Sequence, residues 1–149
     1  MTITYAIEDG LDAEEFVDVL KRSGLAPRRP VDKPDVIRAM VENADLVISA
    51  RDGEGRLVGV ARSVTDFAYC CYLSDLAVDR ECQRQGIGKE LMARTKEASG
   101  GGKITLVLLS APDGMDYYRK AGLEKFDNCF GIRRTYKESR RNQDDDPCL

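Results

Sequence analysis

The sequence predicts a layered protein of the α/β or α+β class, and three observations lead to this expectation. Segments typical of strands are interleaved along the chain with segments whose apolar residues repeat at helical spacing. The 149 residues are close to the size of one domain with its own core. No internal repeat or long linker divides the chain. We therefore expect one domain over residues 1–136 and a disordered tail over residues 137–149.

The first half of the chain is predicted to form three strands and two helices. Asp12 is a suitable cap for the first helix, and Phe16 and Leu20 lie on one side of it. Gly24 and the two prolines that follow end that helix. In order, we expect a strand at residues 3–7, helices at 12–22 and 34–43, and a hairpin of strands at 46–50 and 57–64.

The second half is predicted to add strands around two further helices. A strand at residues 67–78 precedes an amphipathic helix at residues 89–98. Residues 104–109 are continuously apolar, which is typical of a central strand that is buried on both faces. A short helix begins at Pro112 and ends before Gly122. Strands at residues 123–126 and 130–136 are expected to complete the sheet as a terminal pair.

The most informative segment joins the strand at 67–78 to the helix at 89–98 and reads Gln83-Arg84-Gln85-Gly86-Ile87-Gly88. Gly86 and Gly88 have no Cβ that would block the approach of an anion. The first N–H groups of the helix have no intrahelical partners and lie at the positive end of its dipole. Arg84 adds a formal positive charge. This turn is therefore predicted to bind phosphate.

Two common phosphate motifs do not match this turn. A dinucleotide-binding fingerprint requires a third glycine, and the chain has Leu91 at that position. A P-loop requires a glycine where the chain has Gln83, and a serine or threonine where it has Glu90. Both motifs are excluded.

The turn resembles motif A of the GNAT superfamily, the acyl-CoA-dependent N-acyltransferases. That motif reads Gln/Arg-x-x-Gly-x-Gly/Ala and follows a strand that ends in a Leu-Ala-Val-like tripeptide, which is Leu76-Ala77-Val78 in this chain. Residues 118–123, Tyr-Arg-Lys-Ala-Gly-Leu, resemble the family's Tyr-x-x-x-Gly-Phe segment, with Leu123 in place of Phe. The family's order and spacing are kept over residues 45–136.

The resemblance implies a GNAT fold: α+β, with a mixed, mostly antiparallel sheet of about seven strands, splayed in the middle and flanked by about four helices. It implies acetyl-CoA as co-substrate, with the pantetheine arm in the splayed gap against free backbone groups of Leu76 and Val78. N–H groups around Gly88 would hold the pyrophosphate. The implied cofactor-binding residues are Leu76, Ala77, Val78, Gln83, Arg84, Gln85, Gly86, Ile87, Gly88, Lys89 and Tyr118.

The implied reaction is direct attack of a neutral amine on the acetyl thioester through a tetrahedral oxyanion. Tyr118 matches the family's general acid, and the N–H of Val78 is expected to stabilise the oxyanion. Many relatives have a Glu two residues before the tripeptide, where this chain has Ser74. Asp75 points to the opposite face of the strand and cannot simply replace it. The base is therefore left open between Asp75, a water ordered by Ser74 or Tyr72, and solvent.

One further departure from the family lies near Ala111. Many relatives have an Asn near Ala111 that contacts the cofactor arm, and its absence puts one contact in doubt.

The rival to a transferase is a non-catalytic acyl-CoA sensor or interaction module, and a nucleotide-binding protein is the least favoured hypothesis. The acceptor is expected to be an amine of a small molecule, peptide or protein. Arg28 and Arg29 either contact an anionic group on that acceptor or are solvated.

Composition excludes several other functions. The net charge of −3 argues against nucleic acid or an anionic membrane as the main partner. The chain has no histidine, and its five cysteines lack metal-ligand spacing, so we expect free thiols and no metal. No signal peptide or membrane span is evident, which favours a cytoplasmic location. The predicted terminal strand pair is compatible with a homodimer, although no pattern requires one.

Overall fold

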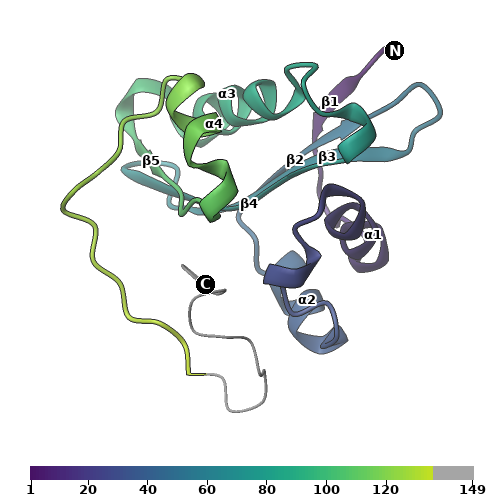
Figure 1. Ribbon diagram of the computed structural model, residues 1–149, viewed down its shortest axis with the longest axis horizontal. Helices are drawn as coiled ribbons and strands as arrows, with labels where there is room; N and C mark the ends of the chain where they lie inside the picture. Colours follow the sequence, from purple (N-terminus) through teal and green to yellow (C-terminus); the bar gives the residue numbers. More distant parts are fainter. Residues whose placement is uncertain (136–149) are drawn as a thin grey trace. The chain divides into compact units, whose positions relative to one another are not determined.

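The computed structural model describes residues 1–135. The chain divides into two compact units, one at Met1–Leu108 and another that begins at Leu109, and each is described by itself. The expectation of a single domain stays a prediction, and the expected tail at residues 137–149 lies outside the described residues. The first unit contains the sheet and most of the helices (Figure 1).

The first unit is built on a mixed sheet of five strands in the order β1-β2-β3-β4-β5. The first four strands are antiparallel neighbours, and β5 runs parallel to β4. This confirms the α+β class and the mixed, mostly antiparallel sheet. The strands are β1 (Thr4–Ile7), β2 (Leu46–Arg51), β3 (Leu57–Thr65), β4 (Cys70–Val78) and β5 (Thr105–Val107).

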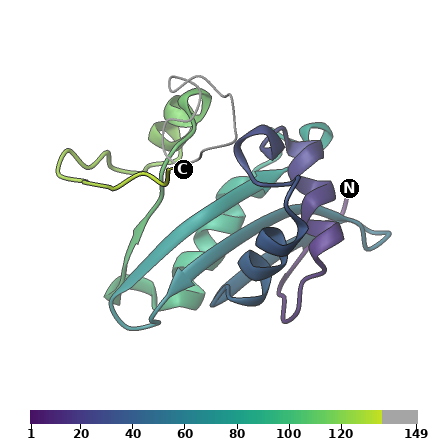
Figure 2. The ribbon, with the colours of Figure 1, turned by 90° about the horizontal axis from the view of Figure 1, so that it is seen from below.

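Three helices cover the two faces of this sheet. The helices α1 (Ala13–Ser23) and α2 (Pro34–Glu42) lie on one face, and α3 (Ile87–Ser99) lies on the other (Figures 1 and 2). Short 3-10 turns connect them at η1 (Ala26–Arg28), η2 (Arg80–Cys82) and η3 (Gly101–Lys103). The second unit contains α4 (Met115–Lys120). The described residues thus form four α-helices, as the sequence predicted.

The sequence signals for the first helix act as expected. The Asp12 carboxylate accepts a hydrogen bond from the N–H of Glu14 at 2.7 Å and caps the start of α1. Gly24 ends the helix in the left-handed region, at φ 87°. Between them, Phe16 and Leu20 are fully buried. Together with apolar residues of α2 and the sheet, they form the core on this face.

Close packing at Gly59 fixes where α3 begins. A Cβ added at Gly59 would lie 3.1 Å from side-chain atoms of both Ile87 and Leu91, so the helix rests directly on the β3 backbone. Gly59 is also the residue of β3 that lies opposite Val78, the last residue of β4. The first turn of α3 is therefore held beside the end of β4.

Three expectations for the later part of the chain are wrong. Among residues 1–135 the sheet has five strands and not seven. The predicted terminal pair is missing, because residues 123–126 and 130–135 are not strands. Tyr136, the last residue of that predicted pair, lies outside the described residues. The apolar segment at residues 104–109 gives only the three-residue β5, at the edge of the sheet and not at its centre. Without the terminal pair, no described strand lies beyond β5 to make it central.

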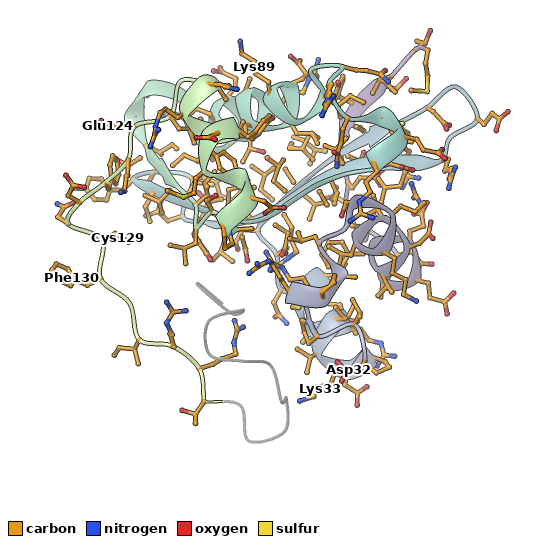
Figure 3. All side chains as sticks on the ribbon, viewed as in Figure 1. Asp32, Lys33, Lys89, Glu124, Cys129 and Phe130 are labelled. Carbon is orange, nitrogen blue, oxygen red and sulfur yellow. The ribbon has the colours of Figure 1, made fainter. Side chains whose placement is uncertain are left out.

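The second unit begins with the short turn η4 (Pro112–Gly114), and α4 follows directly. The N–H of Leu123 donates to the Tyr118 carbonyl at 3.0 Å and closes the end of the helix. The segment after it contains large apolar side chains that are largely exposed, among them Phe130 at 94% (Figure 3). The predicted helix at residues 112–121 is thus confirmed as a short turn followed by a helix.

Candidate acyl-CoA site

The predicted phosphate turn has the geometry that an anion requires. Gly86 begins α3 with φ 82°, and no side chain caps the helix there. The first intrahelical bond is that from Glu90 N–H to the Gly86 carbonyl, at 3.0 Å, so the preceding N–H groups of the helix stay available. A Cβ added at Gly86 would meet no atom within 4 Å, which shows that the space in front of the turn is open.

The charged residues of the turn lie at its surface. Arg84 has a left-handed backbone, with φ 64°, and is exposed together with Gln85 and Lys89. Lys89 projects outward from α3 (Figure 3). The turn therefore combines free N–H groups, a helix dipole and two cationic side chains, which is a suitable site for a phosphate group.

Gln83 joins this turn to β4. Its side-chain Nε2 donates to the carbonyl of Val78 at 2.9 Å. The sequence assigned Gln83 to the cofactor site, and this assignment stays a prediction; in the structure its amide binds the end of the strand. The hydrogen bond connects the start of the phosphate turn to the strand end that carries the expected oxyanion contact.

The backbone groups of Leu76 and Val78 face away from β3. The N–H of Asp79, the residue after β4, donates to the Val58 carbonyl of β3 at 2.8 Å. Because backbone groups point to alternate sides along a strand, those of Ala77 also face β3, and those of Leu76 and Val78 face the other side. These are the two residues that the sequence assigned to the pantetheine arm.

Within the unit Met1–Leu108, that other side of β4 is unpaired over most of its length. β5 pairs with β4 only from Cys70 to Tyr72, and its last partner is Val107. Within the unit Met1–Leu108, no strand pairs with β4 on this side from Leu73 to Val78. An extended, amide-containing ligand can add to this edge as a strand does.

Asp75, one of the candidates for the base, lies inside the protein. It is 0% exposed, and its two carboxylate oxygens bind the guanidinium groups of Arg29 and Arg62. Arg29 also donates to the Ser74 carbonyl at 3.0 Å, and Arg62 donates to the Ser74 hydroxyl at 2.9 Å. A buried carboxylate is stable in such a paired and hydrogen-bonded environment.

Sequence reasoning missed this cluster. It left Arg29 either in contact with an acceptor or solvated, whereas only 10% of its side chain is exposed and it binds the strand. The signal was present in the alternation of the strands, because Arg62 and Asp75 both occupy positions that face the core. Two opposite charges at facing core positions are expected to pair.

Tyr72 and Ser74 are the residues that the sequence offered for holding a water. Burial raises the pKa of Tyr72, and the nearby Ser74 hydroxyl and Arg29 guanidinium offset this only in part. Among residues 1–135, the Tyr72 hydroxyl is enclosed and has no hydrogen-bond partner. Among the described residues, the structure therefore leaves one donor and acceptor group available near Ser74 of β4.

Tyr118, the expected general acid, belongs to the second unit. It is half-buried on α4, and its ring packs edge to face on Tyr117 with centroids 5.2 Å apart. The neighbouring Tyr117 is 42% exposed. Because Tyr118 and β4 lie in different compact units, the role of Tyr118 at the thioester stays a prediction.

The cysteines bear on the predictions of free thiols and of metal binding. Cys70 is exposed and the adjacent Cys71 is buried, as expected for neighbours on a strand, and the cysteines within residues 1–135 are all free. In that part of the chain, no three His, Cys, Asp or Glu residues lie together as metal ligands. The same residues include no helix with the length and apolar character of a membrane span.

Comparison with known proteins identifies the family. A model of the acetyltransferase (GNAT) domain matches residues 22–131, and the chain belongs to this family. It is 30% identical to serotonin N-acetyltransferase 2, chloroplastic, from Oryza sativa subsp. japonica, across 76% of this chain and 56% of that protein. The chain spans about half the length of the curated relatives it matches.

Solved structures show the same fold. A GNAT family acetyltransferase from Streptococcus pneumoniae has a TM-score of 0.69 at 23% identity, covering 92% of this chain and 100% of that one. A GNAT family N-acetyltransferase from Escherichia coli, solved in complex with CoA, has a TM-score of 0.63 at 21% identity, covering 82% of this chain and 68% of that one.

Proposed function

We propose that the protein is an N-acetyltransferase that moves the acetyl group of acetyl-CoA to an amine. One observation carries this proposal: the uncapped start of α3 lies beside the unpaired edge of β4, within one compact unit. The turn offers N–H groups to a pyrophosphate, and the edge offers the amides of Leu76 and Val78 to an extended arm. CoA contains both of these chemical parts in one molecule.

The same edge suits the chemistry of acyl transfer. A neutral amine attacks the thioester carbon, and the tetrahedral intermediate places a negative charge on the former carbonyl oxygen. The N–H of Val78 points away from β3 and is the proposed donor to that oxygen. The C–S bond then breaks, and we propose that Tyr118 gives its proton to the departing thiolate.

The attacking amine must also lose a proton. Asp75 is unsuited to accept it, because both of its oxygens bind guanidinium groups and it is 0% exposed. We propose that Asp75 has a structural role. The proton is proposed to leave through a water held near Tyr72 and Ser74, where the buried tyrosine hydroxyl has no partner among residues 1–135.

The test is to incubate the protein and acetyl-CoA with a metabolite extract and a pooled peptide library, and to follow acetyl addition by mass spectrometry. We expect an acetylated amine that forms with the wild type. With Tyr118→Phe it should form at least tenfold more slowly, because removal of a general acid lowers the reaction rate about 10²–10⁴-fold. The product identifies the acceptor class. Absence of any product, with acetyl-CoA bound, would contradict the transferase.

A non-catalytic acyl-CoA sensor is the second candidate, and the engagement of Asp75 favours it. Ser74 stands where many relatives have a Glu as the base, and the carboxylate of the adjacent Asp75 is ion-paired with Arg29 and Arg62. The sensor predicts tight binding of acetyl-CoA with no transfer to any amine. The transferase predicts turnover that depends on Tyr118.

A further inference from the structure

A β-bulge at Ser74 decides which backbone groups reach the open edge of β4. Arg62 lies opposite Asp75, and the next residue of β3, Ser63, lies opposite Leu73. Ser74 is therefore an extra residue of β4 without a partner on β3. Such an insertion changes which residues of the strand face each side.

The change is visible in the hydrogen bonds on the two sides of the bulge. Before it, the Tyr69 carbonyl accepts from the Thr105 N–H of β5 at 3.0 Å, so the backbone N–H and C=O groups of the odd-numbered residues up to Leu73 point toward the β5 side. After it, the backbone groups of the odd-numbered residues point toward β3, and those of Leu76 and Val78 point toward the open side. In a regular strand, the backbone groups of Ala77 would face the open side in place of those of Leu76 and Val78.

Two arginines from different elements bind the bulge. Arg62 comes from β3, and its guanidinium bridges the Asp75 carboxylate and the Ser74 hydroxyl. Arg29 comes from the loop after η1, and its guanidinium bridges the other oxygen of Asp75 and the Ser74 backbone carbonyl. The bond to that carbonyl is specific to the bulge, because Ser74 lies outside the β3 register.

We infer that Arg29 is a positioning residue for the acyl-CoA site, since it holds the Ser74 bulge in the form that presents Leu76 and Val78 to the pantetheine arm. The inference rests on the proposed function, which assigns this edge to that arm. The planar guanidinium makes the two bonds at once, one to Asp75 and one to Ser74. A lysine keeps the charge but has no rigid fork to bridge both groups.

The experiment compares the affinities of CoA and of its nucleotide half, 3′-phospho-ADP, by calorimetry. The nucleotide half contacts the turn at the start of α3, whereas only CoA contains the pantetheine arm. In the wild type we expect CoA to bind more tightly. In Arg29→Lys the affinity for CoA is expected to fall about five- to tenfold, the effect of losing about one hydrogen bond, while that for 3′-phospho-ADP stays unchanged.

Arg51→Lys is the matched control. Arg51 also binds two carboxylates, those of Glu8 and Glu15, but it lies on β2 and touches neither β4 nor the turn. It is expected to leave both affinities unchanged. If Arg29→Lys does not fold, Arg29→Gln leaves Asp75 paired with Arg62 and removes the fork that bridges Asp75 and the Ser74 carbonyl. A loss of about five- to tenfold confined to CoA is expected for it as well.

Three results would overturn the inference. The first is an unchanged affinity of Arg29→Lys for CoA, or of Arg29→Gln where that variant is used. The second is an equal loss for CoA and 3′-phospho-ADP, which indicates a merely structural role. The third is a wild type that binds the two ligands equally, which would also remove the proposed pantetheine site, whereas the first two leave that site intact.

Discussion

The side-chain amide of Gln83 donates to the backbone carbonyl of Val78 at 2.9 Å and so connects the turn at the start of α3 to the end of β4, where the thioester is proposed to bind. Phosphate binding and thioester positioning are expected to be coupled through this hydrogen bond. Replacing Gln83 by Met keeps the length of the side chain and removes its donor. We expect an affinity for acetyl-CoA about fivefold weaker, as for one ordinary hydrogen bond, with the melting temperature unchanged. An unchanged affinity by calorimetry would show that the contact is unimportant.

Gly86 and Gly55 form a matched pair for testing the phosphate turn. Both have φ +82°, and a Cβ at either position would meet no atom within 4 Å. Alanine should therefore lower the free energy of unfolding by a similar amount at both, about 1–2 kcal/mol, because of the left-handed backbone. Only Gly86→Ala is expected to weaken CoA binding, since its methyl group stands where the phosphate approaches.

The measurements for this pair are chemical unfolding and calorimetric titration with CoA. Equal losses of CoA affinity in Gly86→Ala and Gly55→Ala would indicate a general effect of stability. That result would count against an anion site at the start of α3.

Asp66 gives a prediction for acid stability. The N–H groups of Tyr69, Ala68 and Cys70 donate to its carboxylate at 2.7, 2.9 and 3.1 Å, and they lower the pKa of Asp66 to about 2. Because the pKa is lower in the folded state than the ordinary aspartate value of 3.8, this stabilisation is present above that value. It is lost as the pH falls from about 4 toward 2.

The check is an NMR titration of the Asp66 carboxyl, together with unfolding of wild type and Asp66→Asn across the same pH range. We expect the wild type to lose more stability on acidification than Asp66→Asn. Because Asp66 is exposed, the difference is expected to be small. A carboxyl that titrates at its ordinary pKa would show that the turn is not formed as described.

The cysteines test the strand register around the bulge. Cys71 and Cys82 are buried, and burial, with the nearby Asp79 and Glu81, raises the pKa of Cys82. Cys70 and Cys129 are exposed. At neutral pH, iodoacetamide is expected to label the exposed pair at once and the buried pair only after unfolding, as read by peptide mass mapping. Rapid labelling of Cys71 would contradict the register of β4.

The sequence predicted best where local signals and burial agree. Asp12 and Gly24 mark the ends of α1, and Gly86 lies in the turn that was expected between β4 and the next helix. The unpaired edge at Leu76 and Val78 followed from the family resemblance, and the structure gives it a physical basis in the hydrogen bonds to β3.

The remaining parts depended on long-range contacts that no local pattern contains. Residues 104–109 are apolar throughout, but whether such a strand is central depends on what pairs beyond it, and no strand does so among residues 1–135. The contact of Arg29 with Asp75 joins residues 46 positions apart, so it emerges only when the loop after η1 folds against β4. The bulge at Ser74 likewise requires the register of two strands.

One compact unit is proposed to bind CoA through the start of α3 and the edge of β4. Backbone amide NMR tests it most directly, with CoA and 3′-phospho-ADP titrated in turn. We predict that both ligands shift the amides of Gly88 and Lys89, and that only CoA shifts those of Leu76 and Val78. Amides that respond at neither place, or β4 amides that respond equally to both ligands, would contradict the account.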